Sequence, residues 1–509
     1  MAEANANAAS GRPSLLQNWI SAVGLIIAAG SFFAVICLLA IDFFAHFPNP
    51  YMGILTYFVA PVFLIAGLTL AVVGVVRERR RRVRLAAGAA AFFPLIDLNK
   101  PRHRKALGGI AGFGALFLLL TAIGSYRSYH FTESRQFCGQ TCHAVMKPEF
   151  TAYQNSPHAR VSCTECHIGP GAGWFVRSKL SGTYQVYATL FDKFPRPIPT
   201  PIKNLRPAQE TCEQCHWPKK FFGSVERENH HFLGDQSNTE WTVRLLMKIG
   251  GGDPTEGPVG GIHWHMNIGH RVEYIHTDEQ RQVIPWLRVT AADGGVTVYE
   301  SKDKPLKPEE IAAAPIRRMD CMDCHNRPSH IYRSPDRSVD IAISTGRIDR
   351  RIPFIKKQAV EVLAAEYKTT AEALQRIPTL LKAYYEKEHA GFLKENRKLL
   401  DDAIAEVLRI YQTNFFPEMK VNWRTYPNDI GHSISIGCFR CHDGKHVSAE
   451  GRVVSKECRT CHTIIAQGRG QQLANISADG LEFEHAVDIG DLWKEMNCAE
   501  CHTGVLPSQ

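Results

Sequence analysis

Residues 163–167 read "CTECH", in which two cysteines are separated by two residues and a histidine follows directly. At this spacing the two thiols can add to the two vinyl groups of one haem, and the histidine is placed under the iron. Zinc ribbons and disulfide frameworks also use paired cysteines, but neither requires a histidine after every pair. The pattern therefore predicts covalently bound c-type haem, with the motif histidine as proximal iron ligand. It occurs six times, at Cys163, Cys166 and His167, at Cys212, Cys215 and His216, at Cys321, Cys324 and His325, at Cys438, Cys441 and His442, at Cys458, Cys461 and His462, and at Cys498, Cys501 and His502.

A longer variant of the motif precedes these six. Residues 137–146 read "FCGQTCHAVM", so three residues separate Cys138 from Cys142, and His143 follows. One extra residue can bulge without moving both sulfurs out of reach of a haem, so we expect a seventh haem here. The seven motifs, numbered 1 to 7 in chain order, account for all of the 15 cysteines except Cys37. Covalent haem attachment takes place in an export compartment, which places this part of the chain outside the cytoplasm.

The first 126 residues differ in character from the rest. Three uncharged apolar runs, at residues 19–41, 51–76 and 106–125, are each long enough to cross a bilayer of about 30 Å at about 1.5 Å per residue. A shorter run at residues 85–96 cannot cross and is expected to be an interfacial or packed segment. Residues 1–126 are therefore predicted to form a three-span membrane anchor.

The basic residues give this anchor an orientation. The loop at residues 77–106 holds ten Lys or Arg against two acids, a net +8 out of +9 for the whole chain. The positive-inside rule places this loop and the amino terminus in the cytoplasm, and everything after Tyr126 on the outer side. The chain is thus predicted to be a multi-pass protein of a bacterial inner membrane with its haem domain in the periplasm. Its basic charge indicates topology or lipid contact and gives no reason to expect nucleic acid.

The outer region divides at changes in sequence pattern. Strand-like stretches with a glycine-centred hairpin occur between residues 262 and 300, and helical periodicity occurs between 353 and 412. In the helical part, Thr369 with Glu372 predicts a capping box, and Pro378 should kink or end the second helix. We expect a mainly α fold with haem-packed irregular regions: three transmembrane helices, then a multihaem cytochrome c domain with a small β element and a helical insert. The predicted regions are 127–235 with motifs 1 to 3, 236–337 with strands and motif 4, the insert at 338–417, and 418–509 with motifs 5 to 7.

The motifs and their surroundings resemble a known family. An apolar run just before "CGQTCHAVM", followed by "YQNSPHARVSCTECH" at residues 153–167, resembles the NapC/NirT family of membrane-anchored cytochromes c, which includes the NrfH type. Later stretches, "GIHWHMN", "CMDCHNRPSH" and "CFRCHDGKH", resemble the seven-haem inner-membrane cytochromes of metal-reducing bacteria. The resemblance implies a quinol dehydrogenase that passes electrons to periplasmic carriers. Three predicted spans and seven motifs exceed the one span and four or five haems that are typical of NapC/NirT members.

The resemblance also implies particular site residues. In the family a methionine after the first motif ligates iron, which matches Met146; the alternative is that the motif histidine ligates normally and Met146 only packs. A thioether ligand would raise the haem potential. A family lysine after the second motif contributes to the quinol site, which matches Lys179, although the family's nearby acid is replaced here by Tyr184 and Gln185. Independently, a carboxylate beside the bilayer is a functional candidate, so Asp42 at the outer end of the first span could accept a quinol proton.

Sixth iron ligands must come from histidines outside the motifs. Thirteen such histidines follow residue 126, and six are needed if haems 2 to 7 each carry two imidazoles. Neighbours compete in the pairs His230/His231 and His263/His265, and His432 also lies near a motif. The distal ligands predicted from position are His158, His231, His265, His330, His446 and His485.

Two classes of function are compatible with these features. The first is a quinol dehydrogenase that oxidises membrane quinol, with menaquinol the expected type, and passes electrons along its haems to periplasmic c-type cytochromes or a reductase in anaerobic or extracellular respiration. The second is a terminal reductase of a small nitrogen or sulfur oxyanion, which would need an open haem; the C-x-x-C-K motif of pentahaem nitrite reductases does not occur in the sequence. A third possibility is a passive electron-conducting subunit with further membrane partners.

Overall fold

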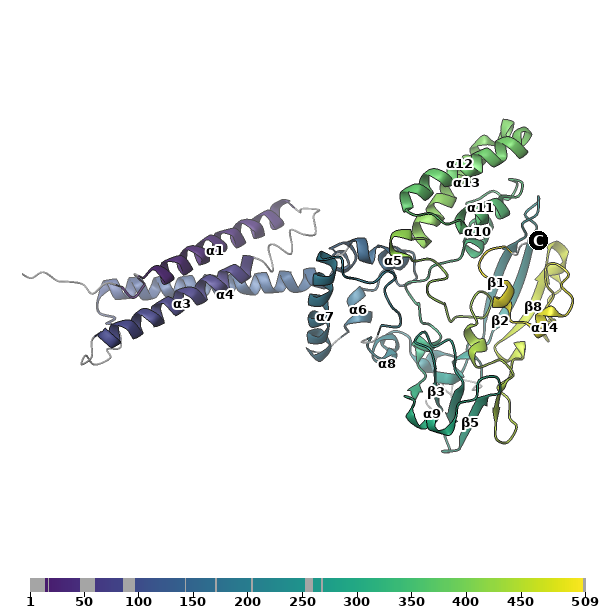
Figure 1. Cartoon of the computed structure of the whole chain (residues 1–509), viewed down its shortest axis with the longest axis horizontal. Coiled ribbons are helices and arrows are strands. Elements are labelled where there is room, and N and C mark those ends of the chain that lie inside the picture. Colours follow the sequence, from purple (N-terminus) through teal and green to yellow (C-terminus); the bar gives the residue numbers. More distant parts are fainter. Residues whose placement is uncertain are drawn as a thin grey trace, which may run out of the picture. The chain divides into compact units, whose positions relative to one another are not determined.

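The computed structural model divides the chain into two compact units, Met1–His143 and Ala144–Gln509 (Figure 1). The residues described by the structure are 14–16, 18–45, 60–85, 97–141, 143–169, 172–202, 205–251, 260–266 and 269–506.

Three long helices form the first unit: α1 (Trp19–Ala45), α3 (Ala60–Leu85) and α4 (Pro101–Thr132). Helices α1 and α3 pack through small residues. A Cβ added at Gly24 would lie 2.4 Å from the backbone nitrogen of Ala71, and Ser21 Oγ donates a hydrogen bond of 3.0 Å to the carbonyl oxygen of Ala71. Close backbone approach at glycine with a hydroxyl-to-carbonyl bond is typical of helix pairs inside membranes.

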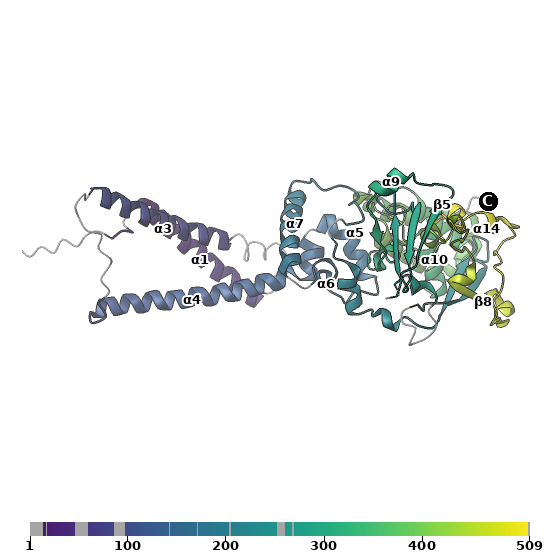
Figure 2. The ribbon, with the colours of Figure 1, turned by 90° about the horizontal axis from the view of Figure 1, so that it is seen from below.

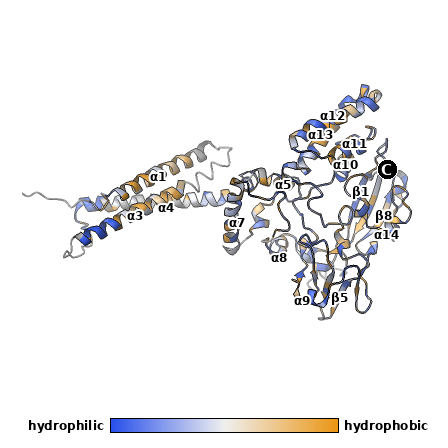
Figure 3. Cartoon of the chain, viewed as in Figure 1, coloured by the Kyte–Doolittle hydropathy of each residue, from blue (hydrophilic) through white to orange (hydrophobic). Residues whose placement is uncertain are grey.

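Two helices in the described part of the chain are long and apolar enough to cross a membrane, Trp19–Leu38 and Ala60–Arg84. The apolar lengths of α1 and α3, and the basic end of α3, are visible in Figure 3. The third predicted span lies within one continuous 32-residue helix, α4, but α4 is not among these two. The described residues therefore contain two candidate spans, where three were predicted. Apart from its first residue, Leu85, the short apolar segment at residues 85–96 lies outside the described residues.

Helices dominate the start of the second unit, although haem-packed irregular structure was predicted around the motifs. They are α5 (His143–Gln154), α6 (Cys163–His167), α7 (Ala172–Leu190) and α8 (Ala208–Thr211). The 19-residue α7 was missed because its apolar residues lie largely exposed, Leu180 at 69% and Tyr184 at 66%.

The β structure is more extensive than the predicted small element. A three-stranded antiparallel sheet has the order β1 (Val225–Phe232), β2 (Glu240–Met247), β8 (His462–Gly468). A five-stranded antiparallel sheet has the order β6 (Arg317–Arg318), β3 (Arg271–Ile275), β4 (Trp286–Thr290), β5 (Val296–Ser301), β7 (His446–Ser448). Strand β5 of this sheet is labelled in Figure 2. The predicted hairpin is the β4–β5 connection, where Gly294 has a φ of +85°. Strands β7 and β8 come from the carboxyl-terminal region and so tie it to the middle of the chain.

The remaining short helices mostly carry haem motifs or lie next to them. They are η3 (Cys212–Gln214), η4 (Pro218–Lys220), η5 (Ile262–Met266), α9 (Pro308–Ala313), η6 (Cys321–Asp323), η7 (Pro417–Met419), η8 (Gly437–Arg440), η9 (Cys458–Thr460), η10 (Gly470–Ala474), α14 (Leu492–Glu495) and α15 (Cys498–Cys501).

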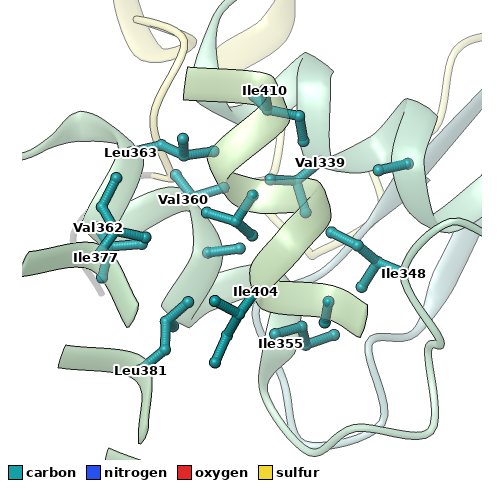
Figure 4. Packing of buried hydrophobic residues seen from close by; sticks show 14 of the residues in the cluster. Val339, Ile348, Ile355, Val360, Val362, Leu363, Ile377, Leu381, Ile404 and Ile410 are labelled. Carbon is teal, nitrogen blue, oxygen red and sulfur yellow. The ribbon is translucent and has the colours of Figure 1, made fainter. Parts of the chain in front are cut away.

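The predicted helical insert consists of α10 (Pro335–Ser344), α11 (Ile355–Ala364), α12 (Thr370–Glu388) and α13 (Ala390–Asn414). Their apolar faces enclose the largest hydrophobic core of the chain's described part (Figure 4). Thr369 caps α12 as predicted, its hydroxyl accepting from the Glu372 amide at 3.1 Å. The other half of the predicted capping box is shifted by one residue, because the Glu372 carboxylate accepts from the Lys368 amide at 2.8 Å. Pro378 does not end α12, which continues to Glu388; the non-helical backbone occurs at Asn396 inside α13.

Candidate haem sites

Motif 1 lies on a widened helical turn. Residues Phe137–Thr141 form a π-helix, η2, in which each backbone hydrogen bond spans one more residue than in an α-helix. The extra residue between Cys138 and Cys142 is taken up in this turn. Cys142 and the side chain of His143 lie outside the description, and Met146 is half-buried on α5.

Motifs 3, 4, 5 and 7 share one backbone turn. The amide of the motif histidine donates to the carbonyl of the first motif cysteine, at 2.8 Å from His216 to Cys212 and 2.8 Å from His502 to Cys498. The same bond measures 2.8 Å in motif 4 and 3.0 Å in motif 5. This turn is the local structure that the C-x-x-C-H spacing predicts.

Each histidine of motifs 2 to 7 faces one further histidine. A metal–nitrogen bond of about 2 Å and about 1 Å from nitrogen to ring centre, counted on both sides, place two axial imidazoles about 6 Å apart. The ring centres here are separated by 5.9 to 6.4 Å, so each pair leaves the space that one haem iron needs. The pairs are His330 with His167 (6.3 Å), His158 with His216 (6.0 Å), His263 with His325 (6.4 Å), His265 with His442 (5.9 Å), His432 with His462 (6.2 Å) and His485 with His502 (5.9 Å).

Four of the six predicted distal histidines, His158, His265, His330 and His485, are in these pairs. His446 is not, because both of its ring nitrogens are already bonded: Nδ1 lies 2.9 Å from Asp443 Oδ1 and Nε2 lies 2.7 Å from the carbonyl oxygen of Ile284. His231 is not either; its Nδ1 lies 3.4 Å from Asp340.

His263 and His432 complete the six pairs, in which the predicted His231 and His446 do not occur. His263 and His265 lie on the 3₁₀ turn η5, which directs them to motifs 4 and 5 respectively. His432 precedes motif 5 but faces His462 of motif 6. The two histidines of "HWH" were a sequence signal that one short turn supplies a partner to each of two motifs. No local signal in the sequence indicates which motif His432 faces.

Backbone carbonyls orient several of the paired rings through Nδ1. The Nδ1 atoms of His158, His330 and His263 lie 3.3, 3.0 and 2.7 Å from the carbonyl oxygens of Pro328, Glu149 and Ile249. An Nδ1–H bond of this kind fixes the tautomer whose Nε2 is free for metal. Burial, then the charges of Arg327 and His167, lowers the pKa of His330 to about 4, which keeps the imidazole neutral as ligation requires.

Thiols of successive motifs lie close enough to influence one another. A hydrogen bond with Cys321 lowers the pKa of the Cys212 thiol to about 6. Burial, and then the nearby thiol of Cys438, raises the pKa of Cys324 to about 12 and that of Cys461 to about 11. A thiol of motif 3 likewise contributes to raising the pKa of Cys166 in motif 2, and a thiol of motif 6 contributes to raising the pKa of Cys498 in motif 7, in both cases after the larger effect of burial. From motif 2 to motif 7, each motif therefore has a cysteine close to a cysteine of the next motif in the chain.

The two predicted quinol-site residues belong to different units. Lys179 lies half-buried on α7, and its carbonyl accepts from Thr183 Oγ1 at 2.9 Å. Asp42 lies near the carboxyl end of α1, and its side chain is outside the description.

Comparison with known proteins decides the family. The model of the amino-terminal region of the NapC/NirT cytochrome c family matches residues 100–197, and the cytochrome c3 model matches residues 431–508. The cytochrome c-type protein ImcH of Geobacter sulfurreducens is 45% identical over 489 residues, which cover 96% of this chain and 95% of ImcH. The chain belongs to the NapC/NirT family.

A more distant NapC/NirT relative is the cytochrome c-type protein TorC of Escherichia coli K12, 24% identical over 218 residues, or 41% of this chain and 53% of TorC. No solved structure matches the chain. Family membership confirms that this protein is a membrane-anchored, multihaem c-type cytochrome that transfers electrons.

Proposed function

We propose that this NapC/NirT cytochrome oxidises quinol, with menaquinol the expected substrate, and passes the electrons to a periplasmic acceptor. Seven bound haems would supply one-electron redox centres that carry charge away from the membrane. The proposal rests on the continuous series of imidazole pairs and neighbouring thiols from motif 2 to motif 7. A series without interruption is what electron transport along the chain requires.

The same residues would hold the cofactors. Fourteen cysteines bind seven haems covalently, and His158, His263, His265, His330, His432 and His485 are the distal ligands of haems 2 to 7. Met146, with His143 as the alternative, ligates the first iron. We place α4 in the membrane as a third span, because residues 106–125 are uncharged and an odd number of spans sets the haem domain opposite the basic loop.

Quinol oxidation needs a hydrogen-bond partner for each hydroxyl and an acceptor for each released proton. We assign the first role to the ammonium of Lys179, which can donate to a quinol oxygen. Asp42 is our candidate proton acceptor, because Tyr184 and Gln185 replace the acid that other family members have near this lysine. Neither tyrosine nor glutamine accepts a proton readily near neutral pH.

The imidazole pairs favour electron transfer over the terminal-reductase alternative. Histidines stand on both sides of six iron positions, so a small oxyanion would find both axial places taken there. Only the first haem could then offer an open position. A reductase that acted at the last haem of the series would need an open iron position there, but at that motif His485 faces His502.

Substitution of Lys179 tests the quinol site. In lipid nanodiscs, Lys179→Ala should slow haem reduction by a menaquinol analogue at least tenfold and leave reduction by dithionite unchanged. Lys382→Ala is the matched control, since Lys382 lies in the helical insert and pairs with Asp401 at 3.6 Å. Equal quinol kinetics in both variants would remove Lys179 from the site; a wild-type protein that quinol does not reduce would favour the passive-conduit reading.

A further inference from the structure

The loop after motif 4 touches the axial ligands of three successive haems. It runs from His325 to His330, "HNRPSH". His325 is the motif 4 ligand, and His330 faces His167 of motif 2 at 6.3 Å. Between them, the Pro328 carbonyl oxygen lies 3.3 Å from Nδ1 of His158, the partner of motif 3. Six consecutive residues thus supply one ligand to haem 4, one to haem 2 and the orienting carbonyl for haem 3.

One cation holds this loop in place. The Arg327 side chain is only 8% exposed, and its Nε donates to the carbonyl oxygen of His330 at 2.8 Å. The guanidinium carbon lies 4.4 Å from the ring centre of Tyr426 and 5.1 Å from that of Tyr332. Its Nη2 lies 3.6 Å from Glu149 Oε1. A planar cation with aromatic and carboxylate contacts is a position that arginine fills and lysine cannot reproduce.

Glu149 connects the cation to the ligand a second time. Its backbone carbonyl accepts from Nδ1 of His330 at 3.0 Å, while its carboxylate faces Arg327. The distal ligand of haem 2 is therefore held at its ring by Glu149 and at its backbone by Arg327. Any shift of the guanidinium would move the bonds that orient this imidazole.

We propose that Arg327 is a positioning residue that sets the ligand geometry and the reduction potentials of haems 2 and 3 together. Hydrogen bonds to a ligand imidazole and nearby buried charge are both known to tune an iron centre. A buried positive charge favours the reduced haem, because reduction adds an electron. Through His330 and Pro328, one side chain would keep two neighbouring haems matched in potential near the start of the electron path.

The inference rests on the axial pairs assigned under the proposed function, and one set of variants tests both. Arg327→Met removes the charge at similar volume and should lower the reduction potentials of two of the seven haems and change the EPR g-values of the same two. Arg327→Lys keeps the charge but loses the planar contacts, so it should restore part of the potential while the g-values stay altered. Arg409→Met is the control, since Arg409 pairs with Glu406 in the helical insert.

Each result decides one claim. Potentials and g-values that match wild type in both Arg327 variants would overturn the positioning role. If Arg327→Met accumulates without its haems, Arg327→Lys decides alone, and unaltered g-values there would overturn the proposal. Fewer than six bis-imidazole signals in the wild-type protein would instead refute the ligand assignments. Changes in all seven haems, equal to those in Arg409→Met, would indicate general loosening and also refute the inference.

Discussion

Replacing the two histidines of η5 tests whether neighbouring residues serve different haems. The His263 ring lies 6.4 Å from that of His325 and the His265 ring lies 5.9 Å from that of His442. His263→Ala should therefore open the haem of motif 4, and His265→Ala should open the haem of motif 5. Each iron that loses its sixth ligand becomes high spin.

The expected size of the high-spin signal follows from the number of haem motifs. Each single variant opens one haem of seven, so the high-spin ferric EPR signal should grow by about one seventh of the iron over that of the wild-type protein. The double variant should give about two sevenths, because independent sites add. Equal signals in the single and double variants would mean that both histidines serve one haem.

His446→Ala is the internal control for this experiment. His446 was a predicted ligand, but its two nitrogens bond Asp443 and the Ile284 carbonyl. The variant should produce no high-spin iron beyond that of the wild-type protein. A high-spin fraction near one seventh in His446→Ala, and none in His263→Ala, would refute the assignment of ligands from ring geometry.

Four further outcomes are expected. Intact mass should show seven haems per chain, and Cys138→Ala should carry six at full occupancy. Met146→Leu should change the potential or spin state of one haem and leave the others unchanged, as redox titration with EPR can measure; seven unaltered spectra would make Met146 a packing residue. Burial opposes the charge on His446, but the hydrogen bond to Asp443 outweighs burial and raises the pKa of His446. Protonated His446 therefore stabilises the fold fully below the ordinary histidine pKa, and this stabilisation is lost as pH rises through the raised pKa. Thermal unfolding measured against pH should show the loss, and His446→Gln should remove this pH dependence. Leu381→Ala, at a fully buried position of the insert, should lower the free energy of unfolding by about 2–5 kcal/mol with unchanged haem spectra, as denaturant titration can measure.

Local chemistry was predictable from the sequence because its cause is local. The C-x-x-C-H spacing needs one backbone turn, and the bond from His502 to Cys498 supplies it. Helical periodicity with a Thr369 cap likewise identified the insert, and alternation with a glycine turn identified β4 and β5.

Pairing across the fold could not be predicted in the same way. His446 follows motif 5 by four residues, yet strand β7 pairs with β5 and brings its ring to the Ile284 carbonyl. His432 lies nearer in sequence to motif 5 and faces motif 6. Strand β1 is polar along most of its length, and it pairs with β2, which in turn pairs with β8 from the carboxyl-terminal region. Distance along the chain gives no information about such contacts.

Haem reduction by quinol is the measurement that tests the central claim most directly. The full-length protein in nanodiscs would be mixed anaerobically with a menaquinol analogue, with and without a quinone-site inhibitor, and the haem absorbance followed by stopped flow. We predict rapid reduction by quinol that the inhibitor blocks, while dithionite reduces the haems whether or not the inhibitor is present. Reduction by dithionite alone, with no response to quinol, would contradict the assignment of this cytochrome as a quinol dehydrogenase.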